Sequence, residues 1–236
     1  MTTTALPNAS EAAVAETASP VSTVADIGLF PIKLRLPEAV IAAGPDACER
    51  WFTDLTLANA DAIWQMELTP GGELEVRMPP FAPTDNQEVK FIVGLENWNT
   101  AGGAELGKAT GSSGAYRLPS GAIRYPDAAW TPLEKIPFFP TDTPTARPYC
   151  PDFVVEIRST SQSCPSDLGE LLNKMQEYMD NGALLGWLID PIERTVRVYR
   201  AGVTEPELLN DPEMLDGEGV LPGFTFAVRQ LIFDLT

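Results

Sequence analysis

Pro151-Asp152-Phe153-Val154-Val155-Glu156-Ile157-Arg158-Ser159 is the stretch of sequence that decides the fold. Its unbroken β-branched and aromatic residues predict a buried strand over 153–157, although that strand carries one acid. A helix is expected from Ser166 or Asp167 to Asn181-Gly182, because apolar residues recur there at i, i+3, i+4 and i+7. A second apolar strand over 184–189 follows. The three segments together predict one βαβ-like unit inside a mixed sheet.

The rest of the chain also shows the patterns of regular structure. Asp46 is expected to cap a helix over 47–58, and another helix is expected over 84–100. Pro70-Gly71-Gly72 predicts the turn of a β-hairpin, because these residues supply the fixed and the positive φ angles of a chain reversal. Further strands are expected around 106–110, 116–118, 122–124, 127–130 and 195–200, with a surface loop over 137–148.

Length and composition favour one domain with a loose N-terminal arm. The chain has 236 residues, of which 44% are hydrophobic, and this is enough for a sizeable core. Residues 1–28 are mostly Ala, Thr, Ser and Pro, so they cannot bury enough apolar surface to offset the entropy lost on ordering. We expect residues 1–28 to be disordered and residues 29–236 to form a single domain.

Cysteine usage and the lack of a long apolar segment indicate the cellular compartment in which the protein is found. Cys48, Cys150 and Cys164 are odd in number and widely spaced, and the chain has no His. Neither a disulfide framework nor a zinc site is therefore expected. The first 30 residues lack the pattern of a secretory leader, and no run reaches the ~18 apolar residues of a membrane span. The sequence thus predicts a cytoplasmic protein without a membrane partner.

The net charge of −17 argues against a general nucleic-acid binder, because such proteins gain affinity by neutralising phosphates with Lys and Arg. Part of the acidity lies late in the chain, in Glu205, Glu207, Asp211, Glu213, Asp216 and Glu218. A cluster of this kind is typical of a solvated face and need not touch a catalytic site.

Two carboxylates and a cation form the candidate site. Glu156 and Arg158 are two residues apart on one expected strand and share a face, and Asp127 after Pro126 can start a neighbouring strand beside them. Mg²⁺ prefers carboxylate oxygens and needs only one or two acids when a substrate phosphate supplies further ligands. Arg158 could stabilise charge on a phosphate but cannot act as a base. The pattern suits metal-assisted hydrolysis of a phosphodiester.

Three further charged residues each allow two interpretations. Lys174 lies at the edge of the apolar helix stripe, from which it could reach the sheet or pair with Glu170 on the surface. Asp152 shares a face with Glu156 and could support it, or could simply lead the chain into the strand. Glu67 in the hairpin could be an exposed strand acid or part of the site. The residues alone leave these alternatives open.

Several blocks between about Trp51 and Phe233 carry a resemblance to one family. They are Met66-Glu67-Leu68-Thr69-Pro70-Gly71-Gly72-Glu73-Leu74, Tyr116-Arg117-Leu118-Pro119-Ser120-Gly121-Ala122, Pro126-Asp127-Ala128-Ala129-Trp130, the block from Pro151 to Ser159, Lys174-Met175-Gln176-Glu177-Tyr178, Asn181-Gly182, Gly186-Trp187-Leu188-Ile189-Asp190-Pro191, Gly217-Glu218 and Leu221-Pro222-Gly223-Phe224. With these landmarks the chain resembles the Uma family of restriction-endonuclease-like proteins, within the PD-(D/E)xK phosphodiesterase superfamily.

The resemblance implies an α/β fold with a restriction-endonuclease-like core, in which helices flank a mixed central β-sheet and a hairpin and helices are added N-terminally. It implies that Asp127 and Glu156 are metal ligands and that Glu67 can complete the metal site. Arg158 stands where the superfamily usually has Lys, which puts lysine-assisted activation of water in doubt, and Lys174 could supply the missing ammonium. Many relatives carry a His after the Pro-Pro pair, so any function of that imidazole is absent here.

Two functions of different classes follow from these residues. The first is a Mg²⁺- or Mn²⁺-dependent phosphodiesterase, an endonuclease with DNA as its substrate, in which Asp127, Glu156, Arg158 and Lys174 are catalytic. The second is a catalytically inactive nuclease-fold protein that binds a partner, and the net charge of −17 and Arg158 in the Lys position favour it. A homodimer is compatible with the first function, because nuclease-fold proteins often pair to cut both strands.

Overall fold

The computed structural model describes residues 32–61, 65–77, 84–136, 146–159 and 165–235. The predicted disordered arm over 1–28, most of the predicted loop over 137–148, and Cys164 lie outside these ranges. Within the described ranges, no helix is both long enough and apolar enough to cross a membrane.

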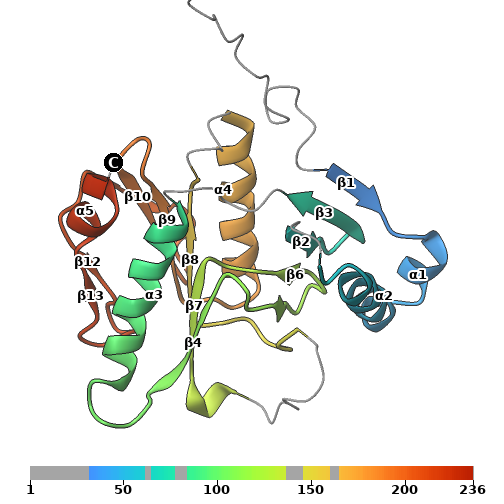
Figure 1. Ribbon diagram of the computed structural model, residues 1–236, viewed down its shortest axis with the longest axis horizontal. Coiled ribbons are helices and arrows are strands. Elements are labelled where there is room, and N and C mark those ends of the chain that lie inside the picture. Colours follow the sequence, from blue (N-terminus) through green and yellow to red (C-terminus); the bar gives the residue numbers. More distant parts are fainter. Residues whose placement is uncertain (1–31, 62–64, 78–83, 137–145, 160–164, 236) are drawn as a thin grey trace, which may run out of the picture.

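A six-stranded mixed sheet forms the centre of the molecule (Figure 1). In spatial order its strands are β11 (Glu207–Asn210), β10 (Thr195–Arg200), β9 (Leu185–Asp190), β8 (Phe153–Ile157), β7 (Ala128–Pro132) and β4 (Gly107–Gly111). β8 and β9 run parallel, and every other neighbouring pair is antiparallel. The prediction of a mixed sheet is therefore confirmed.

The predicted βαβ unit is present and connects the two parallel strands. Helix α4 (Pro165–Asp180) joins β8 to β9 and ends before Gly182, which has a φ of 109°. Its apolar residues Met175 and Tyr178 are fully buried against Val154 and Leu188 of the sheet. The 3.6-residue periodicity read from the sequence thus corresponds to the face of α4 that packs on the sheet.

The other face of the sheet is covered by α3 (Thr84–Thr100), which matches the predicted helix over 84–100. Aromatic side chains dominate this contact: Phe91 lies 4.6 Å from Phe226 and 5.9 Å from Trp187, measured between ring centroids. The C-terminal elements complete this layer beside α3 in Figure 1; they are β12 (Leu215–Asp216), β13 (Thr225–Phe226), α5 (Val228–Leu231) and the 3₁₀ helix η2 (Phe233–Leu235).

Odd-numbered and even-numbered residues of β8 therefore pack against different helices, on opposite faces of the sheet. Phe153, Val155 and Ile157 pack with α3, whereas Val154 packs with α4. Because successive strand residues point to opposite faces, Glu156 shares the α4 face with Val154. This alternation decides which helix can contact the acid.

A second, five-stranded sheet lies on the far side of α4 (Figure 1). Its strands in spatial order are β1 (Ile32–Arg35), β3 (Glu73–Arg77), β2 (Gln65–Leu68), β6 (Ile123–Arg124) and β5 (Tyr116–Arg117). The predicted hairpin is its β2–β3 pair. The pattern of the sequence did not indicate β1, which is exposed along its whole length.

Helices α1 (Glu38–Ala42) and α2 (Pro45–Ala58) cover the second sheet through a small core that includes Phe52 and Leu74. The predicted capping role of Asp46 is wrong, because α2 starts two residues before the predicted start at 47 and so includes Asp46. Pro45 is its first residue, and the preceding Gly44 makes no side-chain cap. Asp46 instead accepts a 2.5 Å hydrogen bond from Arg117, and this ties α2 to β5.

Candidate active site

Asp127 and Glu156 meet at one end of the β7–β8 pair. The ladder pairs Ala128 with Val155, so Asp127 lies opposite Glu156 one step beyond it. The Asp127 Oδ2 accepts a 2.6 Å hydrogen bond from the backbone N–H of Ile157, which fixes the side chain across the end of β8. The structure therefore brings together the two acids that the sequence singled out.

Both acids hold protons more tightly than free carboxylic acids do. Burial and the nearby charge of Glu88 raise the pKa of Asp127 to about 7. Burial raises the pKa of Glu156 to about 8, and the charge of Asp127 adds to this effect while Lys174 opposes it. Ionising both acids in these surroundings is therefore unfavourable, and a bound cation would relieve that cost by displacing the protons.

Lys174 is the cation of this site. Its Nζ lies 2.9 Å from the Glu156 Oε1 and 2.8 Å from the Glu67 Oε1, and it donates a 3.2 Å hydrogen bond to the Tyr125 carbonyl. Burial opposes the charge of Lys174, but Glu156 and Glu67 outweigh burial and raise the pKa of the ammonium. The residue is therefore charged at neutral pH.

The alternative surface pair of Lys174 with Glu170 is absent from the structure. Glu170 instead bonds Arg77 at 2.9 Å and Lys33 at 3.2 Å, both from the second sheet. The side chain of Lys174 thus points toward the sheet, as its position at the edge of the apolar stripe of the helix allowed.

Glu67 is buried, so the interpretation of it as an exposed strand acid is wrong. It is only 5% exposed and receives hydrogen bonds from Arg124 at 3.1 Å and from the Tyr125 backbone N–H at 3.0 Å. Burial alone would raise its pKa, but Lys174 and Arg124 together lower the pKa to about 2. Glu67 is therefore ionised, its charge is balanced by Lys174 and Arg124, and it holds Lys174 in place beside Glu156.

Arg158 and Asp152 each form an ion pair with a residue other than Asp127 and Glu156. The Arg158 Nη1 is 2.7 Å from the Asp190 Oδ2, and both side chains are buried where β8 and β9 end. Asp152 bonds Lys135 at 2.7 Å and precedes β8 at its other end, about 13 Å along the strand from Glu156. The geometry thus agrees with the interpretation of Asp152 as a residue that leads into the strand.

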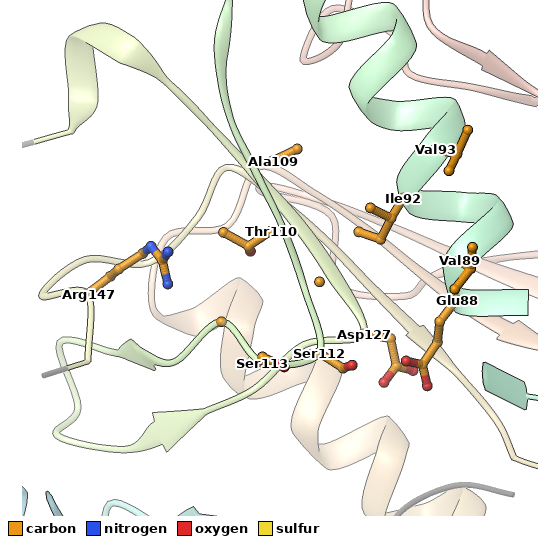
Figure 2. Close-up of a pocket in the computed structure, with 12 residues that line it drawn as sticks. Glu88, Val89, Ile92, Val93, Ala109, Thr110, Ser112, Ser113, Asp127 and Arg147 are labelled. Atoms are coloured by element: carbon orange, nitrogen blue, oxygen red, sulfur yellow. The ribbon is translucent and has the colours of Figure 1, made fainter. Parts of the chain in front are cut away.

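Two residues that the sequence did not single out complete the site. The Tyr178 hydroxyl donates a 3.1 Å hydrogen bond to the Glu156 Oε1. Because Tyr178 follows Lys174 by four residues on α4, any helix that places one beside Glu156 also places the other there, and this spacing was a usable signal. Glu88 on α3 lies beside Asp127 in Figure 2, but nothing in the sequence relates these two segments.

Asp127 and Glu88 lie at one end of a cavity of about 540 Å³ between α3 and β4 (Figure 2). Val89 and Val93 of α3 line one wall, and Arg147 lies at the opposite end from the two acids. Asp127 is partly exposed to this cavity, whereas Glu156 is only 3% exposed. A substrate would thus reach the pair of acids from the side of Asp127.

The donor set suits a hard divalent cation. The chain has no His, and the two acids offer only oxygen ligands, the type that Mg²⁺ and Mn²⁺ prefer. Over the described part of the chain, no group of three or more Cys, Asp or Glu converges to hold an ion without help. Two carboxylates can nevertheless hold Mg²⁺ when water and a substrate phosphate supply the remaining ligands.

Comparison with known proteins shows the fold and the family of the chain. A solved structure described as "a putative nuclease belonging to DUF820 from Anabaena variabilis ATCC 29413" has the same fold, with a TM-score of 0.58 at 21% sequence identity over 72% of this chain and 89% of that chain. No curated protein matches the sequence. The family model Uma2, with the description "Putative restriction endonuclease", matches residues 52–229. The chain therefore belongs to the Uma2 family of restriction-endonuclease-like nucleases.

Proposed function

We propose that this nuclease is a divalent-metal-dependent endonuclease that hydrolyses phosphodiester bonds of DNA. The observation that carries the proposal is the placement of Asp127 opposite Glu156, with the ammonium of Lys174 2.9 Å from Glu156. The two acids have raised pKa values, so they favour binding of a positive charge. The buried ammonium of Lys174 beside them favours binding of an anionic phosphate.

Each residue has a defined part in this proposal. Asp127 and Glu156 would hold Mg²⁺ or Mn²⁺, which when bound lowers the pKa of water and stabilises charge on the phosphate. Lys174 remains protonated, so it orients Glu156 and adds positive charge where the phosphate binds, and it does not accept the proton of water. Tyr178 fixes the Glu156 carboxylate through its hydroxyl. Glu67 holds Lys174 in place.

Lys174 replaces the lysine that the strand itself lacks. Arg158 occupies the lysine position of the Glu-x-Lys pattern, but it binds Asp190 at the ends of β8 and β9. We assign Arg158 to holding these strand ends together, and therefore to positioning Glu156 two residues away. In this proposal the ammonium of Lys174 on α4, which lies on the same face of the sheet as Glu156, takes the role of the strand lysine in the Glu-x-Lys pattern.

The experiment is a cleavage assay with supercoiled, linear and single-stranded DNA in Mg²⁺ or Mn²⁺, using wild type, Asp127→Asn, Glu156→Gln and Arg50→Gln. We expect the two acid variants to lose at least about 100-fold in rate, as for removal of a catalytic metal ligand or an oxyanion contact. Arg50 is exposed on α2, and its variant should cleave like wild type. Calorimetric titration with Mn²⁺ should show binding that is lost in Glu156→Gln. Wild type that neither cleaves nor binds Mn²⁺ would establish the inactive binding protein instead.

A further inference from the structure

The cavity beside Asp127 contains a cation that the catalytic proposal does not use. Arg147 faces the cavity from the end opposite Asp127 and Glu88 (Figure 2). It forms no ion pair with any carboxylate among residues 32–61, 65–77, 84–136, 146–159 and 165–235. In a chain with a net charge of −17, an arginine that lines a cavity and has no acidic partner among these described residues is a candidate site for an anion.

The position of Arg147 is fixed by its surroundings. Its guanidinium carbon lies 5.4 Å from the centre of the Tyr116 ring, an arrangement that stabilises the cation without consuming all its hydrogen-bond donors. Its backbone N–H donates to the Ala115 carbonyl at 2.9 Å, and its carbonyl accepts from the Arg117 N–H at 2.7 Å. The Tyr116 hydroxyl is itself bonded to Thr110 of the cavity wall at 2.8 Å. Such a residue loses little conformational freedom when it binds an anion.

The cavity also provides apolar surface between its two charged ends. Val89 and Val93 line it and are 60% and 52% exposed, although both are apolar. Its volume of about 540 Å³ exceeds what a single phosphate fills and lies in the range of sites for small organic ligands. A nucleotide offers a sugar and base for the valines and a phosphate for Arg147.

We propose that Arg147 is a positioning residue that binds a backbone phosphate of a single DNA strand, next to the phosphate that lies at Asp127. The inference rests on the proposed function, because it takes the strand at Asp127 to be the substrate. A cavity of about 540 Å³ has room for about one nucleotide, and a single strand can place one there without a paired base, so we take the bound nucleotide to be unpaired. The acidic surface repels DNA, and Arg147 supplies local attraction where the strand must lie.

DNA binding measured without metal tests the role of Arg147 separately from the proposed cleavage activity. Fluorescence anisotropy in EDTA measures the affinity of a labelled 12-nucleotide single strand and of the corresponding duplex for wild type, Arg147→Gln, Arg147→Lys and Arg50→Gln. Arg50→Gln removes an equal charge from an exposed position on α2 that does not line the cavity. Thermal unfolding of each variant checks that the contact with Tyr116 is not needed for folding.

We expect Arg147→Gln to weaken single-strand binding about tenfold, the size of one charge-assisted hydrogen bond. The slope of log affinity against log salt should fall by about 0.7, since one phosphate contact is lost. Arg147→Lys should keep that slope and recover part of the affinity, and Arg50→Gln should bind within about twofold of wild type.

Three outcomes would overturn the inference: no measurable binding by wild type, equal effects of Arg147→Gln and Arg50→Gln, or tighter binding of the duplex than of the single strand. Where DNA is cleaved, Arg147→Gln should raise KM and leave kcat within a few-fold of wild type, because the residue does not touch the scissile phosphate. Single-strand binding that depends on Arg147 in a protein that never cleaves DNA would support the phosphate site and reject only the endonuclease.

Discussion

Lys174 and Glu156 are 18 residues apart in sequence, yet the Nζ of one lies 2.9 Å from the carboxylate of the other. A Glu-x-Lys strand would supply both groups from one short segment, whereas here the cation comes from α4 and the acid from β8. The charge of the site therefore depends on how α4 packs against the sheet. The residues of the proposed site also pack α4 against the sheet, so substitutions in this region should alter stability as well as the proposed activity.

Lys174→Met should lower the free energy of unfolding by about 3 kcal/mol at pH 7, because it removes the cation from two buried carboxylates. The loss should grow at pH 9, since Glu156 can no longer relieve the repulsion by keeping its proton. Urea unfolding at both pH values measures this effect. Lys108→Met removes an exposed ion pair with Glu105 and should cost at most about 0.5 kcal/mol. Equal losses for the two variants would contradict the prediction.

Glu156 should make the metal-free protein less stable as pH rises. Its pKa is about 8 in the folded state, so between pH 5 and 8 the native protein holds a proton that the unfolded chain has released. The free energy of unfolding must then fall with rising pH, by on the order of 1–3 kcal/mol. Urea unfolding in EDTA from pH 5 to 9 tests this decline.

Glu156→Gln should remove most of that decline, and the remainder should come from Asp127, whose pKa is also raised. The exposed Glu134 provides the control, because Glu134→Gln should leave a curve parallel to that of wild type. A wild-type stability that rises steadily between pH 5 and 8 is the result that would reject this account.

Segments with a strong repeating pattern were predictable from the sequence. The strand over 153–157 has the predicted bounds, and α3 starts and ends at the predicted residues. The four apolar residues of β8, which flank one acid, and the seventeen residues of α3 leave few alternatives, because only one backbone conformation buries their apolar side chains. The short strands β12 and β13, with two residues each, carry no such periodicity. Tertiary contacts alone determine them.

The candidate site was predictable only where alternation along a strand or periodicity along a helix relates the residues. Asp127 and Glu156 were found because each precedes or belongs to a recognisable strand. The residues alone could not decide between the two interpretations of Glu67, since alternation gives the face of a strand but not what covers that face, and here α4 covers it. Glu88 could not be found, because its place beside Asp127 depends on how α3 packs across the sheet.

Arg124 should be among the most important residues for stability. This buried guanidinium contacts three carboxylates, those of Glu67 at 3.1 Å, Glu75 at 3.0 Å and Glu177 at 2.6 Å, and so joins the second sheet to α4. Arg124→Met leaves three acids without their common partner and should cost about 3–5 kcal/mol in urea unfolding. The exposed pair of Arg35 with Glu38 supplies the comparison, since Arg35→Met should change stability by under about 1 kcal/mol.

Gly107 is required by the close approach of β4 to β7. A Cβ at this position would lie 2.4 Å from the Thr131 carbonyl oxygen and 2.5 Å from the Trp130 ring, so Gly107→Ala should cost about 3 kcal/mol. Gly169 in α4 has open space at the same point, and Gly169→Ala should stabilise the protein by about 0.5–1 kcal/mol. Thermal or urea unfolding of both variants should give shifts of opposite sign, and shifts of the same sign would contradict the geometry.

Glu88 should control the pH at which Asp127 becomes available to a cation. Its charge is the largest cause, after burial, of the raised pKa of Asp127, and the described acids do not converge into a group of three that could hold an ion. Glu88→Gln should therefore shift the pH midpoint of Mn²⁺ binding downward by up to about one unit, with only a modest loss of affinity at pH 9 from the missing negative charge. Calorimetric titration across pH 6–9 measures both, and Asp85→Asn, an exposed acid on the same helix, should leave the midpoint in place. An unshifted midpoint together with a large loss of Mn²⁺ affinity at every pH would instead make Glu88 a ligand, because a residue that acts through the pKa of Asp127 must move the midpoint.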